Sequence, residues 1–201
     1  MSGKGILFDF DGTLVPNLDL ADMRRQIAEM AAAAGVPDDV HAGLYIVEII
    51  EASQAWLLEQ HGGEASLSNQ YAADSHQRIH DIEMQAAGKT RLFDDARRVL
   101  IQLRSADYRL GIVTRNCREA VMTMFPDMNE YIDCLHARDD VEYLKPDPRH
   151  LQANLDALGA DPALSVMVGD GALDMQAGRE LNMRCIGVLT GSNDTEALGA
   201  A

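Results

Sequence analysis

Basic residues are scarce in this 201-residue sequence, which contains 17 lysines and arginines against 32 aspartates and glutamates. The formal net charge at neutral pH is therefore −15. A surface field of that sign repels polyanions, so we expect neither nucleic acid nor an anionic membrane as a partner. Hydrophobic residues make up 47% of the chain and charged residues 24%, which is typical of a protein that folds around a core.

Cysteines are also few, and long apolar runs are missing. Cys117, Cys134 and Cys185 are an odd number without close paired spacing, which favours neither a disulfide framework nor a zinc site. The longest apolar stretch, residues 44–50, is interrupted by Glu48 and is too short to cross a bilayer. The first residues do not have the pattern of a secretory signal. We therefore expect a cytoplasmic protein with reduced thiols and no membrane attachment.

Short runs rich in β-forming residues alternate with segments of helical periodicity. The runs predict strands at residues 5–10, 109–114, 164–169 and 184–189, and a further short strand at 131–135. The intervening segments predict helices at 94–106, 117–125, 150–158 and 174–181. This alternation predicts an α/β fold, a Rossmann-like doubly wound parallel sheet.

One long segment, residues 16–91, contains no convincing strand. Its helical periods, such as 20–34 and 42–59, predict a small all-helical domain of three or four helices inserted after the first strand. We therefore expect an α/β core formed by residues 1–15 and 92–201, with residues 16–91 as a separate helical domain. How the sheet is completed beyond residues 191–193 stays open.

Four carboxylates fall at the ends of predicted strands. Asp9 and Asp11 end the first strand, and Asp170 and Asp174 follow the third of the longer runs. Because ligands of open α/β sheets bind beyond the carboxyl ends of the strands, we expect these side chains to converge. Such a cluster requires a cation, and ligands that are all oxygen favour Mg²⁺.

Two other predicted strand ends carry groups that suit a phosphoryl group. Thr114 offers a hydroxyl and is followed by Arg115, Asn116 and the backbone amides that open the next helix. Lys145 precedes Pro146-Asp147-Pro148, a rigid turn that can fix its ammonium. A hydroxyl, amides, an ammonium and Mg²⁺ together form a receptacle for phosphate.

These residues resemble the four motifs of the haloacid dehalogenase-like hydrolases. Residues 9–14, Asp-Phe-Asp-Gly-Thr-Leu, resemble the first motif; Thr114 resembles the second, Lys145 in Lys-Pro-Asp-Pro the third, and residues 169–174, Gly-Asp-Gly-Ala-Leu-Asp, the fourth. The resemblance covers residues 3–15 and about 92–191, and the insertion after the first motif matches the helical cap of subgroup one. Within the family, the residues around these motifs are most similar to those of phosphoglycolate-phosphatase-like members.

The resemblance implies a magnesium-dependent phosphatase that acts on a small phosphorylated metabolite. It implies that Asp9 is the nucleophile and Asp11 the general acid and base, and that Thr114 and Lys145 hold the phosphate. Arg115 and Asn116 are further candidates for substrate binding. The implied metal site comprises Asp9, the main-chain carbonyl of Asp11, Asp170 and Asp174, the last directly or through water.

Other interpretations stay open. A phosphomutase would share Asp9 and Asp11, and a non-catalytic regulator could retain the fold to bind a phosphorylated ligand or a protein. A dehalogenase is disfavoured because it has no need of a proton donor at position 11. Taken singly, Asp170 and Asp174 could cap a helix, Thr114 could be an N-cap and Lys145 could be solvated. The conjunction of four motifs in one order favours the enzyme.

Overall fold

A computed structural model describes residues 3–201, which form two compact units. The helical unit is Asp19–Gln85, and the sheet unit comprises residues 3–18 together with Ala86–Ala201. The sequence predicts a helical domain over residues 16–91, a wider span than the helical unit. No helix among residues 3–201 is long and apolar enough to cross a membrane.

The helical unit is built from four helices: α1 (Leu20–Ala33), α2 (Asp38–His41), α3 (Ile46–Gln60) and α4 (Ala65–Ala87), the last of which continues into the sheet unit. The side chain of Asp19 caps α1 by accepting from the N–H of Asp22 at 2.9 Å. On α1 the buried residues Met23, Ile27 and Ala31 follow one another at intervals of four. This spacing gives the helix one apolar stripe, which it buries within the unit.

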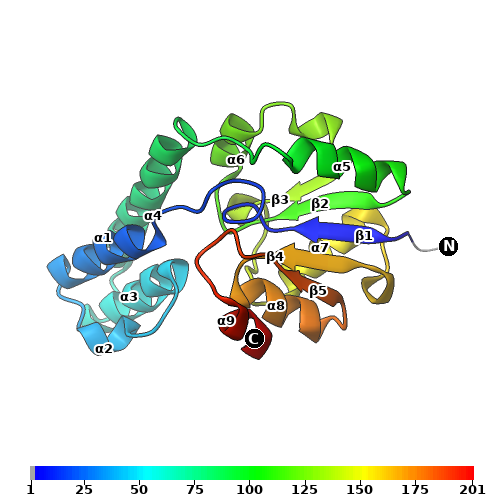
Figure 1. The fold of residues 1–201 in the computed structure, drawn as a ribbon. Helices are drawn as coiled ribbons and strands as arrows, with labels where there is room; N and C mark the ends of the chain where they lie inside the picture. Colours follow the sequence, from blue (N-terminus) through cyan, green and yellow to red (C-terminus); the bar gives the residue numbers. More distant parts are fainter. Residues whose placement is uncertain (1–2) are drawn as a thin grey trace. The chain divides into compact units, whose positions relative to one another are not determined.

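The sheet unit contains five parallel strands: β1 (Gly5–Phe8), β2 (Arg109–Val113), β3 (Cys134–His136), β4 (Val166–Gly169) and β5 (Arg184–Gly187). Their order across the sheet is β3-β2-β1-β4-β5 (Figure 1). The predicted parallel α/β fold is thereby confirmed. The chain builds one side of the sheet from β1 to β3 and then crosses to β4 on the other side of β1. The topological switch point therefore lies between β1 and β4, where such sheets bind their ligands.

Helices cover the sheet on both sides. Figure 1 shows α5 (Ala96–Ser105) and α6 (Arg118–Met124) on one side and α7 (Pro148–Leu158) and α8 (Ala172–Glu180) on the other. The remaining helices are α9 (Thr195–Ala200) and three short 3₁₀ turns, η1 (Met128–Glu130), η2 (Arg138–Asp140) and η3 (Pro162–Leu164). The core on the α7 and α8 side is a cluster of buried apolar residues that includes Leu7, Val113, Leu151, Leu155 and Met167.

Local sequence explains where α7 begins and ends. The side chain of Asp147 caps its start by accepting from the N–H of Arg149 at 2.9 Å, and Pro148 occupies the first turn, where a missing N–H costs nothing. Gly159 ends the helix in a left-handed conformation with φ of 59°, which a glycine adopts without strain.

The third strand along the chain differs from the prediction. The sequence predicts a strand at residues 131–135, but β3 begins only at Cys134. The N–H groups of Tyr131 and Ile132 both donate to the carbonyl of Met128, at 2.9 Å each, so these residues continue the 3₁₀ turn. The side chain of Asp133 then accepts from the N–H of Leu110 at 2.8 Å, which fixes the entry into the strand.

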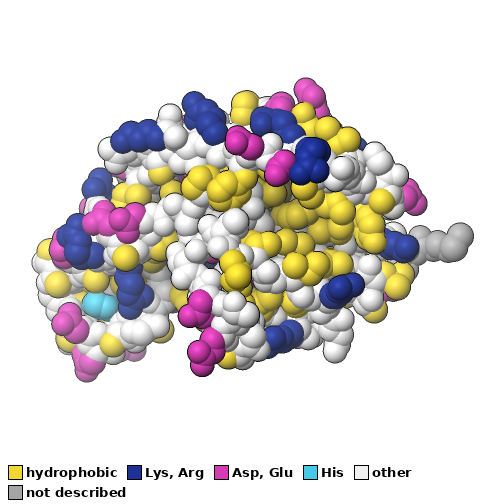
Figure 2. All heavy atoms as spheres, in the orientation of Figure 1, with side chains coloured by type: hydrophobic (Ala, Val, Ile, Leu, Met, Phe, Trp, Pro, Cys, Tyr) yellow, Lys and Arg dark blue, Asp and Glu magenta, His cyan; other side chains and the backbone are white. Residues whose placement is uncertain are grey.

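One face of the β4–β5 side of the sheet is only partly covered. Apolar side chains gather on the surface between α5 and α8 (Figure 2). Val166 and Val168 of β4 are half-buried, and Ile186 of β5 is 42% exposed. Within residues 3–201 no strand pairs with the outer side of β5, which is therefore an edge of the sheet.

Candidate active site

Three of the predicted site residues directly follow the carboxyl ends of central strands. Asp9 follows β1, Thr114 follows β2 and Asp170 follows β4. The N–H of Asp9 donates to the carbonyl of Val168 at 2.8 Å, and that of Thr114 donates to the carbonyl of His136 at 3.1 Å. The ladder of the sheet therefore continues through these residues and fixes where their side chains start.

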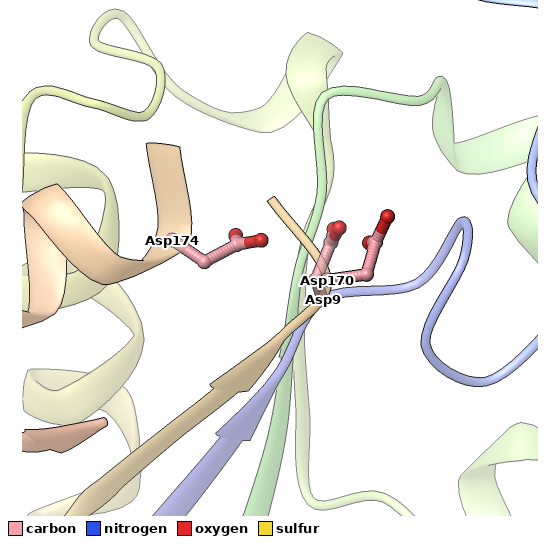
Figure 3. Close-up of side chains that lie close together, drawn as sticks. All are labelled: Asp9, Asp170 and Asp174. Atoms are coloured by element: carbon pink, nitrogen blue, oxygen red, sulfur yellow. The ribbon is translucent and has the colours of Figure 1, made fainter. Parts of the chain in front are cut away.

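Three carboxylates meet beside the switch point. Asp9, Asp170 and Asp174 each offer an oxygen, and these oxygens lie within 4.8 Å of one another. In Figure 3, Asp9 and Asp170 stand side by side at the strand ends, while Asp174 points toward them from the beginning of α8. Asp170 and Asp174 are buried, and the Asp9 side chain is 15% exposed. The structure thus brings together three of the four predicted carboxylates by their side chains.

Lys145 places its ammonium among these carboxylates. Its Nζ lies 2.8 Å from Oδ1 of Asp9 and 2.6 Å from Oδ1 of Asp174, and its side chain is only 3% exposed. The interpretation of Lys145 as a solvated loop residue is therefore wrong. Breaking either of these buried ion pairs would leave an uncompensated charge inside the protein, which is costly. The two contacts therefore hold Lys145, Asp9 and Asp174 in one arrangement.

The cluster carries more negative than positive charge. Burial, and then the charge of Asp9, raise the pKa of Asp170 to about 6 and the pKa of Asp174 to about 7. Burial alone would lower the pKa of Lys145, but the carboxylates of Asp174 and Asp9 outweigh it, so that this pKa is raised. One ammonium does not neutralise three carboxylates. A hard divalent cation fits this all-oxygen set and its surplus negative charge.

Two glycines allow the backbone to approach Asp170 closely. A Cβ atom on Gly12 would lie 2.5 Å from the carboxylate of Asp170, and one on Gly191 would overlap its Oδ2. Gly12 also has φ of +80°, a conformation in which other residues are strained. Any side chain at either position would displace Asp170.

The loop after β5 encloses the same carboxylate. The N–H of Ser192 donates to Oδ2 of Asp170 at 3.4 Å, and the amide of Asn193 donates to the carbonyl of Asp170 at 3.0 Å. The hydroxyl of Thr190 donates to the carbonyl of Gly12 at 2.6 Å. The predictions from the sequence do not place these residues at the site; the run of four small polar or glycine residues after a predicted strand is the signal that could have found this loop.

Asp174 serves two partners at once. Its Oδ2 accepts from the N–H of Gly171 at 3.0 Å at the beginning of α8, while its Oδ1 pairs with Lys145. The helix-capping interpretation of this residue is correct for one oxygen, and the other belongs to the charged cluster. A Cβ on Gly169 would overlap the Asp174 carboxylate, so the glycine is needed for this approach.

Asp11 lies outside the cluster, in the turn that follows β1. The N–H of Gly12 donates to the carbonyl of Val15 at 2.8 Å and closes this turn. The side-chain amide of Asn116 donates to both carboxylate oxygens of Asp11, at 3.1 and 3.0 Å. The sequence predicts Asn116 as a substrate-binding residue, whereas the structure directs its amide nitrogen to Asp11.

Thr114 and Arg115 are likewise engaged with the backbone. The Thr114 hydroxyl accepts from the N–H of Asn116 at 3.0 Å, which leaves its own hydrogen to donate. The Arg115 guanidinium donates to the main-chain carbonyl of Lys145. The predicted phosphate-binding residues after β2 are thus tied to Asp11 on one side and to Lys145 on the other.

Comparisons with known proteins identify the family of this chain. A family model described as haloacid dehalogenase-like hydrolase matches residues 6–188, a range that includes the cluster and Lys145. Pyrophosphatase PpaX from Bacillus velezensis is 26% identical to this chain, and the match covers 97% of this chain and 87% of the relative. Phosphoglycolate phosphatase from Psychrobacter arcticus is 28% identical to this chain, and the match covers 96% of this chain and 86% of the relative. A Bacteroides fragilis structure described as a haloacid dehalogenase-like hydrolase superposes with a TM-score of 0.70 at 23% identity, over 98% of this chain and 93% of the other.

Proposed function

The chain belongs to the haloacid dehalogenase-like hydrolase family, and we propose that it is a phosphatase that hydrolyses a small phosphate monoester through an aspartyl-phosphate on Asp9. The observation that carries this proposal is the position of Lys145, whose buried ammonium contacts both Asp9 and Asp174. It supplies a positive charge where a phosphate must approach a carboxylate nucleophile. The relatives named as phosphatases support the same reaction class.

The proposed cofactor is Mg²⁺. The carboxylates of Asp9 and Asp170 and the main-chain carbonyl of Asp11 would hold it, with Asp174 in support. When bound, Mg²⁺ would neutralise the surplus charge of the cluster and polarise a phosphoryl oxygen. The raised pKa values of Asp170 and Asp174 and the absence of nitrogen and sulfur ligands among the three clustered residues fit such a hard cation.

In the first step a carboxylate oxygen of Asp9 attacks phosphorus, and the bond from phosphorus to the ester oxygen breaks. Asp11, in its acid form, gives its proton to the departing oxygen, so the product leaves as an alcohol. Lys145 and the Thr114 hydroxyl donate to the phosphoryl oxygens and stabilise the charge that develops there.

In the second step water attacks the phosphorus of the aspartyl-phosphate. Asp11, now ionised, takes a proton from that water, and the bond between phosphorus and Asp9 breaks. Inorganic phosphate leaves, and both aspartates return to their starting forms. One residue thus serves as acid and then as base, which requires that it stays in place between steps.

The helical unit is proposed to be the cap that selects the substrate. It is inserted directly after the segment that carries Asp9 and Asp11, and the net charge of −15 disfavours nucleic acids and other polyanionic macromolecules as substrates. A small soluble phosphorylated metabolite is therefore the proposed substrate class. Phosphoglycolate and pyrophosphate, taken from the names of the relatives, are the first compounds to test.

The test is a phosphate-release screen across small phosphomonoesters and pyrophosphate, with Mg²⁺ and with chelator, on the wild type and on Asp9→Asn. We expect Mg²⁺-dependent release by the wild type without any bisphosphate activator, and at least a 10³-fold loss in the variant, an order of magnitude typical of removing a nucleophile. A requirement for a bisphosphate would favour a phosphomutase. No turnover of any compound, with tight binding of one, would favour a regulator and overturn the proposal.

A further inference from the structure

The main chain of Lys145 is anchored by a histidine that the proposed mechanism does not use. The N–H of Lys145 donates to Nδ1 of His150, in the first turn of α7, at 3.2 Å. The carbonyl of the same residue accepts from the Arg115 guanidinium. Both peptide groups of Lys145 are therefore tied to other parts of the site.

The other nitrogen of His150 contacts a carbonyl oxygen that also holds Thr114. Its Nε2 lies 3.2 Å from the carbonyl oxygen of His136, and the same oxygen accepts from the N–H of Thr114 at 3.1 Å. A carbonyl oxygen has two lone pairs and can accept both bonds. One imidazole thus connects the backbone of Lys145 to the His136 carbonyl that holds Thr114, which comes from a different loop.

The partners of His150 determine its protonation. Because Nδ1 accepts from an N–H, Nε2 must carry the hydrogen that is donated to His136, and the ring must be neutral. Burial and the charge of Lys145 lower the pKa of His150 to about 3, in agreement with that tautomer. The ring is fully buried, with 0% exposure, so water does not replace either partner.

A polar pair on α7 is otherwise unexpected. His150 and Asn154 lie four residues apart on the buried side of the helix, beside Leu151, Leu155 and Leu158. The amide nitrogen of Asn154 donates to the carbonyl of Ile112 at 2.9 Å. An apolar residue at position 150 would extend the apolar stripe and need no partners, so a buried imidazole there calls for a specific role.

We propose that His150 is a positioning residue that keeps the ammonium of Lys145 beside Asp9. It does so by connecting the Lys145 N–H to the carbonyl of His136, the same carbonyl that accepts from the N–H of Thr114. This inference rests on the proposed function. His150 contacts neither the three clustered carboxylates nor the substrate in the proposed mechanism and acts through the Lys145 backbone.

Three substitutions separate the two hydrogen bonds of the ring. In His150→Asn the amide oxygen takes the place of Nδ1 and can still accept from Lys145. In His150→Gln the amide nitrogen takes the place of Nε2 and can still donate to His136. His150→Leu removes both. Far-UV circular dichroism and thermal melts first establish that each variant is folded, and kinetic constants are referred to the folded fraction.

We expect His150→Asn to keep kcat within a few-fold of the wild type, since it retains the bond to Lys145. His150→Leu should lower kcat by on the order of 10²-fold, the size of effect expected when a reacting group moves by about 1 Å. His150→Gln should resemble His150→Leu. The inhibition constant of inorganic phosphate should rise in the same order, because Lys145 also binds the product.

Ser165 supplies the matched control at the opposite end of the strands. It is 1% exposed; its hydroxyl accepts from the N–H of Gly5 at 2.9 Å and donates to the carbonyl of Asp161 at 2.7 Å. Ser165→Ala removes two buried hydrogen bonds, as His150→Leu does, but away from the site. It should lower the melting temperature and leave kcat, KM and phosphate inhibition unchanged.

A double-mutant cycle with Lys145→Ala identifies the route of the effect. If His150 acts through Lys145, adding His150→Leu to Lys145→Ala should cost little further activity toward an aryl phosphate. Additive losses in the cycle, or wild-type kcat in folded His150→Leu and His150→Gln, would overturn the inference while leaving the phosphatase intact. A wild type inactive on every phosphate ester tested would instead overturn the proposed function.

Discussion

The amide nitrogen of Asn116 lies 3.1 and 3.0 Å from the two carboxylate oxygens of Asp11. The orientation of this amide is fixed from the other side, because its oxygen accepts from the N–H of Cys117 at 2.8 Å. Asn116 is 2% exposed and belongs to the turn after β2, whereas Asp11 belongs to the turn after β1. The proposed acid and base is therefore oriented from a neighbouring strand end.

Asn116→Ala should slow the cleavage of alkyl phosphates more than that of aryl phosphates. An alkoxide leaves poorly and depends on a well-placed proton donor, whereas a phenolate leaves without much help. General acid catalysis contributes about 10²-fold to 10⁴-fold, so a loss of orientation should cost a part of that on an alkyl ester. The measurement is the phosphorylation step in single-turnover kinetics on both ester types. Equal losses on both would show that Asn116 does not act through Asp11.

Gly12 faces Asp170, and Gly35 serves as its matched control in the same chain. Gly12 and Gly35 have similar left-handed φ values of +80° and +85°, but a Cβ on Gly35 would have nothing within 4 Å. Alanine at either position strains the backbone by about 1 kcal/mol. Alanine at Gly12 should in addition displace Asp170.

We therefore expect Gly12→Ala to weaken Mg²⁺ activation at least tenfold, and Gly35→Ala to lower stability with the same Mg²⁺ dependence as the wild type. Titration of activity with Mg²⁺ measures the metal dependence of both variants, and urea unfolding measures their stability. An unchanged half-saturating Mg²⁺ concentration in folded Gly12→Ala would contradict a metal-binding role for Asp170.

Lys145→Met should strongly lower turnover and destabilise the metal-free protein at pH 8. Methionine keeps most of the volume but leaves the carboxylates of Asp9 and Asp174 without their ammonium, a loss on the order of 3–5 kcal/mol for a buried pair. Urea unfolding in chelator measures this change. The loss should shrink at pH 6, where a carboxylate can take a proton instead. Arg98→Met, which removes an exposed ion pair with Asp95, should leave the unfolding free energy nearly unchanged.

The sequence predicted the sheet well because its strands are short apolar runs separated by helical periods, and each period is visible locally. It also placed Asp9, Thr114 and Asp170 at strand ends, since a strand end is a local feature. The link between Asn116 and Asp11 joins residues 105 positions apart and depends on the register of β1 against β2. The approach of residues 190–193 to Asp170 and the two partners of His150 depend in the same way on packing between elements, which no local pattern encodes.

The stabilisation of the protein by Mg²⁺ should fall as the pH falls from 8 to 6. The pKa values of Asp170 and Asp174 are raised to about 6 and about 7, above the ordinary range of an aspartate. In the metal-free protein below pH 7 these groups therefore hold protons that the unfolded chain releases, so they contribute more stability as the pH falls toward the ordinary aspartate value. His150 opposes this below pH 6.5, because its lowered pKa of about 3 makes the unfolded chain the better proton acceptor.

Mg²⁺ binds the ionised carboxylates, so protons and metal compete in the same window. At pH 8 a concentration of 100 times Kd should add about 2.7 kcal/mol to the free energy of unfolding. At pH 6 each carboxyl group that must lose a proton to bind Mg²⁺ should reduce that gain. The reduction is up to about 1.4 kcal/mol for each pH unit by which the pH lies below the pKa of that group. Urea unfolding at pH 8, 7 and 6, with Mg²⁺ and with chelator, measures the gain directly, and Asp9→Asn should lower it at pH 8. If the gain were the same at pH 8 and pH 6 in the wild type, Mg²⁺ would be binding elsewhere than on these buried carboxylates.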